Sequence, residues 1–527
     1  MTGVISHFTG VVVNLTQGLH RAVQQKPNAV ATVCAGRTRT HRESVDRIAR
    51  LAGALQDLGI EDGERAAILS LNSDRYHEFL GATLWAGGVV VPVNLRWSIP
   101  EIAESLTEVD ARVLVVDDAF AGHVDGIRAA HPRLEHVVHA GDGATPDGMQ
   151  PFEELIGSHE PIEDTGRRGD DLAAVFYTGG TTGRSKGVML SHANLLTSSI
   201  GTLATEHFIS PDGVFLHAAP MFHLADLAAW TGQLIRGGTH VMIPMFEPVA
   251  LMTAVAEHQV TDVLLVPTMI QLLVDHPRID EFDLTSIRRI SYGASPMSEG
   301  VLGRALKALP NAQFTQLYGM TELSPAATGN LPIDHEHPKR RRAAGRALPH
   351  NEVRIVGPDD VELPRGEVGE IVVRGGNVML GYWNRPEETA EALRGGWMHT
   401  GDGGYMDDDG YVYISDRIKD MIISGGENVY SVEVESVLTQ HPSIATCAVI
   451  GVPDEKWGER VHAVVVPVGG ASLTIEELRE FCAERIAGYK TPRSMELVEG
   501  LPLSAAGKVL KRELRKPYWE DQERAVH

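Results

Sequence analysis

The chain has 527 residues, more than one hydrophobic core supports, and its 43% hydrophobic and 22% charged residues are typical of a soluble globular protein with at least two domains. Its 47 Lys and Arg against 70 Asp and Glu give a net charge of −23, which argues against general nucleic-acid binding or attachment to an anionic membrane. Cys34, Cys447 and Cys482 show neither a metal-binding spacing nor a disulfide framework, so we expect a reducing, cytoplasmic setting.

No segment has the roughly 20 uninterrupted apolar residues that a membrane span needs. The most apolar stretch, residues 79–95, is broken by Gly87, Gly88 and Pro92, and it predicts a buried helix followed by a strand. The first residues lack the basic region of a signal peptide. We therefore expect no integral membrane segment.

Helical patterns alternate with short β-branched runs over most of the chain, which indicates βα units and largely parallel sheets. The helix and strand pairs are residues 44–59 and 65–71, 99–110 and 111–118, and 249–260 and 261–267. From about residue 345 the pattern changes to turn-rich antiparallel strands, with Asp409-Gly410 as a hairpin turn. A smaller unit follows after Arg417.

The sequence YTGGTTGRSKG, residues 177–187, predicts a loop that binds phosphate. Its glycines uncover backbone N–H groups and permit positive φ, its threonine hydroxyls add donors, and a lysine adds positive charge. These residues are Thr178, Gly179, Gly180, Thr181, Thr182, Gly183 and Lys186. A flexible surface turn is the disfavoured alternative, because apolar segments flank the loop.

This loop does not follow the Walker pattern, because Ser185 precedes Lys186 and Gly187 follows it. The dinucleotide pattern G-x-G-x-x-G is absent as well. Residues 187–190 predict a buried strand, and the next helix begins only near Ser191 or His192. We therefore expect a nucleotide loop of another kind, and a P-loop ATPase is disfavoured.

The loop resembles the phosphate loop of the adenylate-forming superfamily, which includes acyl-CoA and aryl-CoA ligases, peptide-synthetase adenylation domains and beetle luciferases. Two departures occur: Gly179-Gly180 replaces the usual serine and threonine, and Ser185 replaces the usual proline before the lysine. Both bear on loop stiffness and ATP affinity. The resemblance extends over residues 15–515, and four further motifs follow in the order that the superfamily requires.

The motif SYGASPM supplies small residues, Gly293, Ala294 and Ser295, which let a flat base approach the backbone. The resemblance implies that they form the adenine site. A strand-to-helix turn with Pro296 near the helix start would have the same composition.

The motif QLYGMTE carries Glu322, which the resemblance implies is the ligand of Mg²⁺ on the ATP phosphates, since hard cations take carboxylate oxygen. Thr321 is expected to bond the α-phosphate and Tyr318 to stack on adenine, with Gln316 and Gly319 completing this nucleotide contact. An ordinary carboxylate at a helix N-terminus is the alternative for Glu322.

The motifs HTGD and DRIKD imply that Asp402 accepts the ribose hydroxyls and that Arg417 donates to the ribose or a phosphate. Asp402 would otherwise be a turn residue. Lys419 takes the position where related enzymes hinge. We therefore expect an N-terminal domain at 1–416, a hinge at 417–419 and a C-terminal domain at 420–527.

The motif PLSAAGKVLKREL places Lys508 after Gly507 in a tight turn. The resemblance implies that Lys508 stabilises charge at the carboxylate and the α-phosphate in the first step. In the second step Gly425 and Gly426 would line the pantetheine passage for CoA. The segment SGGENVYS also fits a plain junction between loop and helix with Ser431 as N-cap, and both interpretations can hold.

The segment APMFHLADLAAW, residues 218–230, is expected to line the acyl pocket through His223 and Ala225, with Tyr292 and Met320. Relatives that activate amino acids place an aspartate where this chain has His223, so an amino acid substrate is disfavoured. A purely packed His223 is the favoured alternative to a chemical role. The basic run 335–342 is interpreted as a solvated loop, with contact to CoA phosphates as the alternative.

The fold class expected is α/β: a large N-terminal domain of parallel-rich α/β subdomains with a small antiparallel barrel-like part, and a small, mobile α+β C-terminal domain. The activity expected is ATP-dependent ligation of a medium- or long-chain fatty acid or an aryl acid to CoA, through an acyl-AMP, with ATP, Mg²⁺ and CoA as cofactors and substrates. The catalytic set is Lys508, Lys186, Thr178 and Glu322. The alternatives are loading of a carrier protein and a non-catalytic AMP-binding protein, and the oligomeric state is open between monomer and homodimer.

Overall fold

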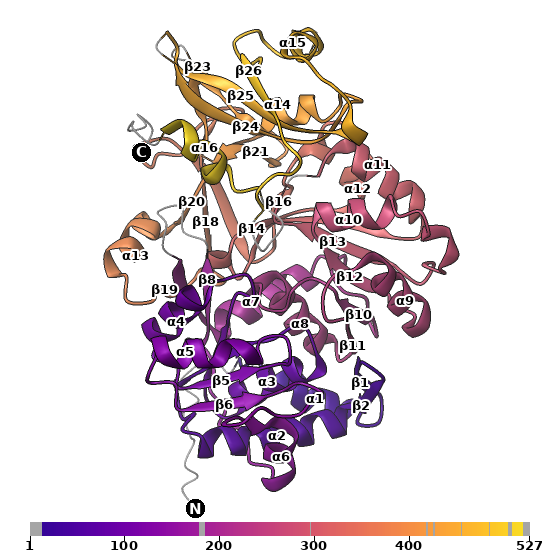
Figure 1. Ribbon diagram of the computed structural model, residues 1–527, viewed down its shortest axis with the longest axis vertical. Helices are drawn as coiled ribbons and strands as arrows, with labels where there is room; N and C mark the ends of the chain where they lie inside the picture. Colours follow the sequence, from indigo (N-terminus) through magenta and orange to yellow (C-terminus); the bar gives the residue numbers. More distant parts are fainter. Residues whose placement is uncertain are drawn as a thin grey trace, which may run out of the picture.

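A computed structural model describes residues 13–178, 185–295, 297–417, 420–424, 427–454, 456–483, 485–503 and 509–519. Within these residues, two large mixed sheets, a four-stranded antiparallel sheet and a separate C-terminal sheet are covered by helices (Figure 1). The α/β class with parallel-rich sheets and a small antiparallel part is confirmed.

The eight-stranded sheet has the order β19-β9-β8-β4-β3-β5-β6-β7. Its inner strands β4, β3, β5 and β6 run parallel. Apart from Arg65, the strands β3, β4 and β5 are apolar, as strands buried on both faces require. Its strands are β3 Arg65–Leu69, β4 Val89–Pro92, β5 Val113–Val116, β6 His136–His139, β7 Gln150–Pro151, β8 Leu172–Thr178, β9 Lys186–Ser191 and β19 Gly381–Tyr382.

The nine-stranded sheet has the order β16-β15-β14-β13-β12-β10-β11-β1-β2, with the strands from β14 to β1 parallel. Its strands are β1 Val30–Cys34, β2 Arg37–Thr40, β10 Val214–His217, β11 Thr239–Met242, β12 Asp262–Leu265, β13 Arg289–Gly293, β14 Gln313–Gly319, β15 Ala326–Asn330 and β16 Arg346–Ala347.

Helices pack against both sheets, and the predicted alternation of helix and strand is confirmed. Helix α3 is buried at every residue and leads into β4, so the prediction of a buried helix followed by a strand is also confirmed. The helices here are α1 Gln17–Gln25, α2 His41–Asp57, α3 Asp74–Trp85, α4 Ile99–Glu108, α5 Val124–Ala130, α6 Phe152–Ser158, α7 His192–Leu203, α8 Leu224–Arg236, α9 Pro248–His258, α10 Pro267–Val274, α11 Glu299–Ala308 and α12 Pro332–His335.

After the nine-stranded sheet the chain forms an antiparallel sheet in the order β17-β18-β20-β21. The expected hairpin turn at Asp409-Gly410 joins β20 to β21, with Gly410 at φ +81°. These strands are β17 Asn351–Val356, β18 Gly369–Gly375, β20 Met398–Met406 and β21 Val412–Arg417, and helix α13 Pro386–Ala392 lies before β20.

The C-terminal unit has its own sheet and apolar core, and it lies at the top of Figure 1. Helix α14 begins at Ser431 with Tyr430 as N-cap, so the prediction of Ser431 as the cap is wrong by one residue. The elements of this unit are β22 Ile422–Ser424, β23 Glu427–Val429, β24 Ile444–Asp454, β25 Gly458–Pro467, β26 Ser494–Leu497, α14 Ser431–Leu438, α15 Ile475–Ala483 and α16 Lys511–Trp519.

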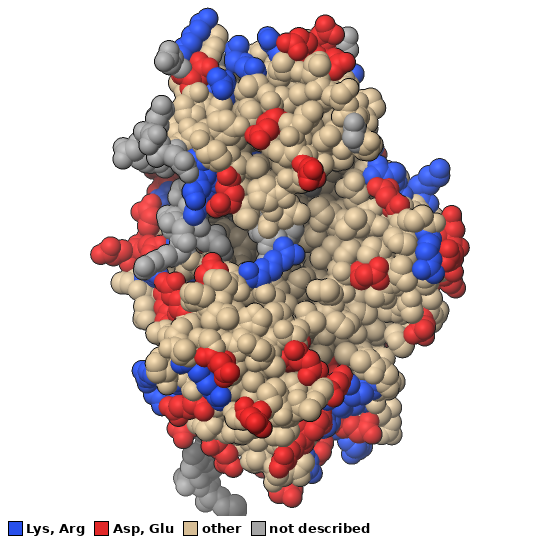
Figure 2. All heavy atoms as spheres, in the orientation of Figure 1, with Lys and Arg blue, Asp and Glu red and all other residues tan. Residues whose placement is uncertain are grey.

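The face seen in Figure 2 is hollowed at mid-height, below the C-terminal unit, and a basic side chain lies at the hollow. Acidic and basic side chains are interspersed over the rest of this face. In the described part of the chain, no helix combines the length and the apolar character needed to cross a membrane.

Candidate active site

The predicted site residues gather where the parallel strands end. Strands β10, β12, β13 and β14 run parallel, so the segments that leave their carboxyl ends emerge at one edge of the sheet. Those segments carry His223 after β10, Ala294 and Ser295 after β13, and Glu322 after β14. The parallel direction of these strands therefore brings the adenine motif, the QLYGMTE motif and the acyl segment to one edge of the sheet.

The predicted phosphate loop joins β8 to β9. These strands are antiparallel, and Thr178 lies opposite Lys186 at the start of the loop. The buried strand predicted at 187–190 is confirmed as part of β9, and Ser191 caps α7 by accepting a hydrogen bond from the Asn194 backbone N–H. The remaining predicted loop residues lie outside the described residues: Gly179, Gly180, Thr181, Thr182 and Gly183.

The Lys186 side chain contacts one acidic and one aromatic side chain. Its ammonium pairs with the Glu388 carboxylate on α13 and lies 4.8 Å from the ring centroid of Tyr382. The hydrogen bond from Lys186 lowers the pKa of Glu388, so this carboxylate is ionised at neutral pH. The lysine side chain is 22% exposed and remains accessible to solvent.

Glu322 lies in the 3₁₀ turn Thr321–Leu323 and is only 5% exposed. Its Oε1 accepts a hydrogen bond of 2.8 Å from the Tyr382 hydroxyl. Burial, and then the Glu322 carboxylate, raise the pKa of Tyr382, so this hydroxyl stays protonated and donates. Tyr382 thus contacts both the predicted metal ligand and the predicted phosphate lysine.

Asn377 fixes the segment before β19 to this turn. It is fully buried, and its side-chain amide donates to the backbone oxygens of Leu323 at 2.6 Å and Ala326 at 3.1 Å. The backbone carbonyl of Asn377 accepts a hydrogen bond from the Ser324 hydroxyl at 2.7 Å. The turn that carries Glu322 is therefore held by hydrogen bonds from a segment more than 50 residues away.

The predicted ribose residues also come together. The Tyr318 hydroxyl donates to Oδ2 of Asp402 at 2.8 Å, which joins β14 of the nine-stranded sheet to β20 of the antiparallel sheet. Asp402 lies directly opposite Arg417 in the β20–β21 ladder. The two motifs HTGD and DRIKD are thus neighbours in space, as their roles require.

Close contacts between neighbouring chain segments explain Gly293 in the adenine motif and Gly319 in the QLYGMTE motif. A Cβ on Gly293 would lie 2.2 Å from the Leu317 backbone oxygen, and one on Gly319 would lie 1.9 Å from that of Pro325. Ala294 follows with φ +66°, a left-handed conformation that turns the chain away from the strand. Both glycines therefore allow close strand contact, and Ala294 lies exposed at the sheet edge.

Tyr292 is buried beneath this edge rather than open to it. It is 2% exposed, and its hydroxyl is 2.8 Å from Nε2 of His335 and donates to Gln316 Oε1 at 3.4 Å. Burial raises the pKa of Tyr292. Met320 is half-buried at the start of the turn that carries Glu322.

The first turn of α8 positions the remaining acyl residues. His223 is the N-cap residue, half-buried, with its ring 4.2 Å from that of Phe222. Ala225 is also half-buried and packs against the apolar cluster that contains Phe215 and Leu264. This side of the site is therefore largely apolar.

A chain of buried polar side chains lies under α8. Asp226, 1% exposed, bonds Nδ1 of His217 at 2.7 Å, and Nε2 of His217 is 3.0 Å from Nδ1 of His240. Trp230 Nε1 donates to Nδ1 of His77 at 2.9 Å. Burial lowers the pKa of His77 to about 3 and that of His240 well below its usual range, so both are neutral near pH 7.

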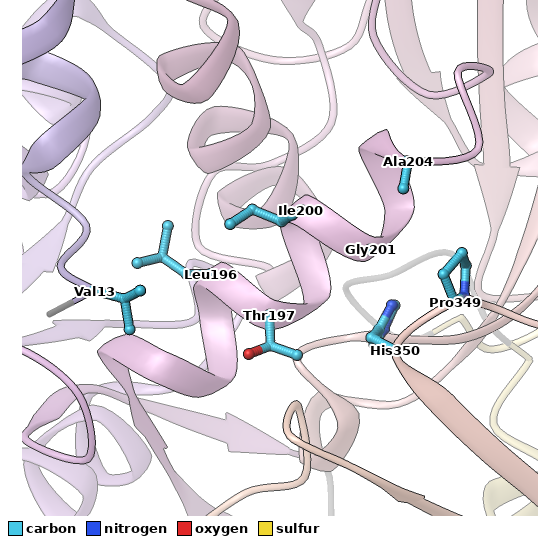
Figure 3. A pocket seen from close by; sticks show the side chains of 8 residues that line it. All are labelled: Val13, Leu196, Thr197, Ile200, Gly201, Ala204, Pro349 and His350. Carbon is cyan, nitrogen blue, oxygen red and sulfur yellow. The ribbon is translucent and has the colours of Figure 1, made fainter. Parts of the chain in front are cut away.

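A shallow pocket of about 360 Å³ lies elsewhere, along α7 (Figure 3). It is lined by Val13, Leu196, Thr197, Ile200, Gly201, Ala204, Pro349 and His350. None of the predicted site residues lines it, so we do not assign the acyl group to this pocket.

The remaining predictions divide between the described and the undescribed parts of the chain. Of the basic run, Arg340 pairs with Asp409 at 3.1 Å and Arg342 contacts Glu299. Lys508, Lys419, Gly425 and Gly426 lie outside the described residues, and the side chain of Arg417 is not described.

Comparison with known proteins identifies the family. The family profile described as AMP-binding enzyme matches residues 19–383, and the profile of the AMP-binding enzyme C-terminal domain matches residues 433–508. The chain belongs to this family, and its expected membership of the adenylate-forming superfamily is confirmed.

Two curated relatives and one solved structure show the enzyme class. A feruloyl-CoA synthase of Amycolatopsis sp is 41% identical over 500 residues, covering 94% of this chain and 98% of that protein. The fatty acid–[acyl-carrier-protein] ligase ScoC of Streptomyces coeruleorubidus is 35% identical over 509 residues, covering 96% of each. ATP-bound MatB from Rhodopseudomonas palustris superposes with a TM-score of 0.86 at 33% identity, covering 96% of this chain and 99% of that one. The expected enzyme class, an AMP-forming acyl-CoA synthetase, is confirmed, and ATP is its nucleotide.

Three residues beside the site were not predicted from sequence: Asn377, Tyr382 and Glu388. Glu388 stands in PEET, which the sequence shows only as acidic residues in the first turn of a helix. Tyr382 stands in a two-residue strand, too short for a periodic pattern. These residues come to the site through the pairing of β19 with β9, which joins residues nearly 200 positions apart, and a single sequence does not show this pairing.

Proposed function

We propose that this enzyme converts an uncharged aromatic or fatty carboxylic acid to its CoA thioester through an acyl-AMP, with an aromatic acid preferred. The observation that carries the proposal is that Lys186, Glu322 and Asp402 come from three different sheet regions and are linked by two tyrosines, beside an apolar wall. Tyr382 contacts Lys186 and Glu322, and Tyr318, four residues before Glu322, donates to Asp402. The 41% identity to a feruloyl-CoA synthase, against 35% for the fatty acid ligase, favours the aromatic acid.

In the first step an oxygen of the substrate carboxylate attacks the α-phosphorus of ATP, and pyrophosphate leaves with the electrons of the broken P–O bond. The protein supplies alignment and positive charge rather than covalent chemistry. Lys186, Thr178 and the loop residues 179–183 would bind the departing phosphates. Asp402 and Arg417 would hold the ribose, with Tyr318, Gln316, Gly319, Thr321 and the 293–295 edge around the adenine and the α-phosphate.

The carboxylate of Glu322 fits a role toward Mg²⁺. Among the described residues, no group of three or more His, Cys, Asp or Glu side chains could hold a metal. Mg²⁺ is usually bound through one or two carboxylates together with substrate phosphates, so a single buried carboxylate is the expected donor set. When bound, the ion would neutralise charge on the phosphates, while Tyr382 keeps the carboxylate oriented.

The acyl side supports an acid that carries no second charge. Asp226 is the acid nearest to the position where relatives place an aspartate for the substrate amine, and here it is buried and bonded to His217 at 2.7 Å. Because its side chain is buried in the core, Asp226 is not offered to a substrate. His223, Ala225, Met320 and the edge beside Tyr292 would enclose the acyl chain.

In the second step the CoA thiolate attacks the acyl-AMP carbonyl and AMP leaves. The C-terminal domain would first present Lys508 to the carboxylate and α-phosphate. It would then turn about Lys419, within the hinge at 417–419, so that Gly425 and Gly426 line the pantetheine path. The domain division at 1–416 and 420–527, and the homodimer, stay predictions.

The experiment is an acid-dependent exchange of labelled pyrophosphate into ATP with a panel that includes ferulate, palmitate, malonate and phenylalanine. We expect exchange with ferulate first and palmitate second, and CoA-dependent AMP release with the same acids. A preference for malonate or phenylalanine would contradict the uncharged-acid proposal. If none of the acids supports pyrophosphate exchange, the result would favour a non-catalytic AMP-binding protein.

A second candidate is an acyl-AMP ligase that loads a carrier protein, which the similarity to ScoC favours. The adenylation half-reaction is the same in both, so only the acceptor distinguishes them. AMP release measured with CoA and with a holo-carrier protein, at equal acyl-AMP, separates the two. Faster AMP release with the carrier protein would identify that protein, rather than CoA, as the acceptor.

A further inference from the structure

Strand pairing places Tyr382 and Lys186 on one face. In the antiparallel pair of β19 and β9, Tyr382 lies opposite Val188, so these two side chains share a face. Lys186 lies two residues from Val188 on the same strand and therefore on that face as well. The lysine ammonium consequently lies over the tyrosine ring, 4.8 Å from its centroid.

The other end of the same ring reaches Glu322. Tyr382 is 7% exposed, Glu322 is 5% exposed, and the hydroxyl-to-carboxylate hydrogen bond is 2.8 Å. A hydrogen bond to a buried carboxylate is among the stronger ones in a protein, because its acceptor is charged and the local dielectric is low. The orientation of Glu322 therefore depends on this hydroxyl.

Glu388 is bound to Lys186 in a more exposed setting. Its side chain is 36% exposed, and Arg385 donates to its Oε1 at 3.5 Å. An ion pair open to solvent is weak, whereas the triphosphate of ATP carries several negative charges. A phosphate can therefore replace Glu388 on the lysine at little cost.

We propose that Tyr382 is a positioning residue for the adenylation step, which orients the Glu322 carboxylate with its hydroxyl and the Lys186 ammonium with its ring. Glu388 competes with an ATP phosphate for the Lys186 ammonium. This inference rests on the proposed function, because it needs Glu322 and Lys186 to act on the ATP phosphates.

The first experiment is calorimetric titration of the full-length protein with ATP, with and without Mg²⁺. Tyr382→Phe keeps the ring and removes the hydroxyl, so Mg²⁺·ATP binding should weaken about ten-fold, while metal-free ATP binding changes less than about two-fold. Tyr413→Phe is the matched control, since its hydroxyl also donates to a carboxylate, Asp407, at 3.2 Å. It should bind both forms as the wild type does.

A double-mutant cycle separates positioning from mere packing. In a Glu322→Ala background, Tyr382→Phe should have no further effect on Mg²⁺·ATP binding, because its partner is gone. An equal ten-fold loss in both backgrounds, or no loss in the wild-type background, would overturn the role of the hydroxyl.

The second experiment concerns Glu388, whose side chain is half-exposed, so we expect its variants to fold as the wild type does. Glu388→Gln should tighten ATP binding by up to about five-fold, the value of a solvent-exposed ion pair. The gain should vanish in a Lys186→Met background. Glu387→Gln, an exposed neighbour in the same helical turn, is the control. Weaker ATP binding in Glu388→Gln would overturn the exchange of partners.

The single variants distinguish this inference from the proposed function. If Glu322→Ala and Lys186→Met exchange pyrophosphate as the wild type does, the proposed site is wrong and this inference falls with it. If both are impaired while Tyr382→Phe and Glu388→Gln bind ATP as the wild type does, only this inference is wrong.

Discussion

The phosphate side and the acyl side of the candidate site are held in different ways. On the phosphate side, Lys186, Glu322, Tyr382 and Glu388 come from distant segments and meet through their side chains. On the acyl side, His223 and its neighbours lie on a helix turn that is fixed from below by buried polar groups. We therefore expect single substitutions to alter chemistry on the phosphate side and stability on the acyl side.

The largest effect is expected from Lys508, the proposed catalytic lysine, which lies outside the described residues. Lys508→Ala should lower acyl-AMP formation about 1,000-fold, because one charge donor to the reacting groups is lost. Thioester formation from supplied acyl-AMP should stay within about three-fold. Pyrophosphate exchange and a thioester assay measure the two steps, with Lys516→Ala as the control. An equal loss of acyl-AMP formation and thioester formation would show that Lys508 does not act in the first step alone.

Lys186→Met tests the phosphate side within the described structure. The kcat/KM for ATP should fall about 100-fold, as on loss of one preorganised charge donor. The free energy of unfolding should change by less than about 1 kcal/mol, because the Lys186–Glu388 pair is partly solvated. A large stability loss with unchanged ATP kinetics would reverse the comparison between the two sides.

Asp226→Ala tests the acyl side in the opposite sense. It leaves the buried His217 without its carboxylate, so the free energy of unfolding should fall by about 2–3 kcal/mol in urea titration. The KM for ATP should stay within about two-fold. Asp212→Ala, which removes an exposed carboxylate paired with Lys26, should cost less than about 1 kcal/mol. A stability loss no greater than that of Asp212→Ala would show that the buried pair does not hold the acyl side.

Acid should weaken the acyl side through the histidines beneath it. His77 has a pKa of about 3 in the folded protein and about 6.5 when unfolded, so the unfolded chain binds more protons between these values. Stability should therefore fall as the pH drops below 6.5, by about 2 kcal/mol for this group between pH 7 and pH 5. The groups that act on it are His217, Asp74, His41 and Arg39.

The check is urea unfolding of the wild type and His77→Gln at pH 7 and pH 5. The variant should lose about 2 kcal/mol less than the wild type on acidification, because glutamine takes up no proton. The same loss in both proteins would assign the acid sensitivity to other groups.

Much of the fold could be predicted because local patterns and tertiary structure agree. Helices such as α2 and α4 have amphipathic patterns and capping signals, and the buried strands β4 and β5 are rich in valine. The motif residues were identified through the resemblance to the adenylate-forming superfamily, and the structure places those after β10, β13 and β14 at the carboxyl ends of parallel strands. For these elements a single sequence carries enough information.

Contacts between distant segments could not be predicted. The pairing of Tyr382 with Val188 depends on which distant strand adds to the edge of the eight-stranded sheet. The bond of Asn377 to the carbonyl of Leu323 depends on how that sheet docks on the nine-stranded sheet. Nothing in GYW or PEET shows which strand lies beside it. The burial of Tyr292 and the His217–Asp226 bond were missed for the same reason, because a histidine or a tyrosine near an apolar run fits either a site or a core.

The amide of Asn377 has a consequence for protein engineering. Its hydrogen bonds to the carbonyls of Leu323 and Ala326 make residues 319–326 and 377–382 structurally dependent on each other, although about 50 residues separate them. A chimaera with a single crossover between these segments would take Glu322 from one parent and Tyr382 from the other. Recombination of this enzyme with its relatives should therefore exchange both segments together, or neither.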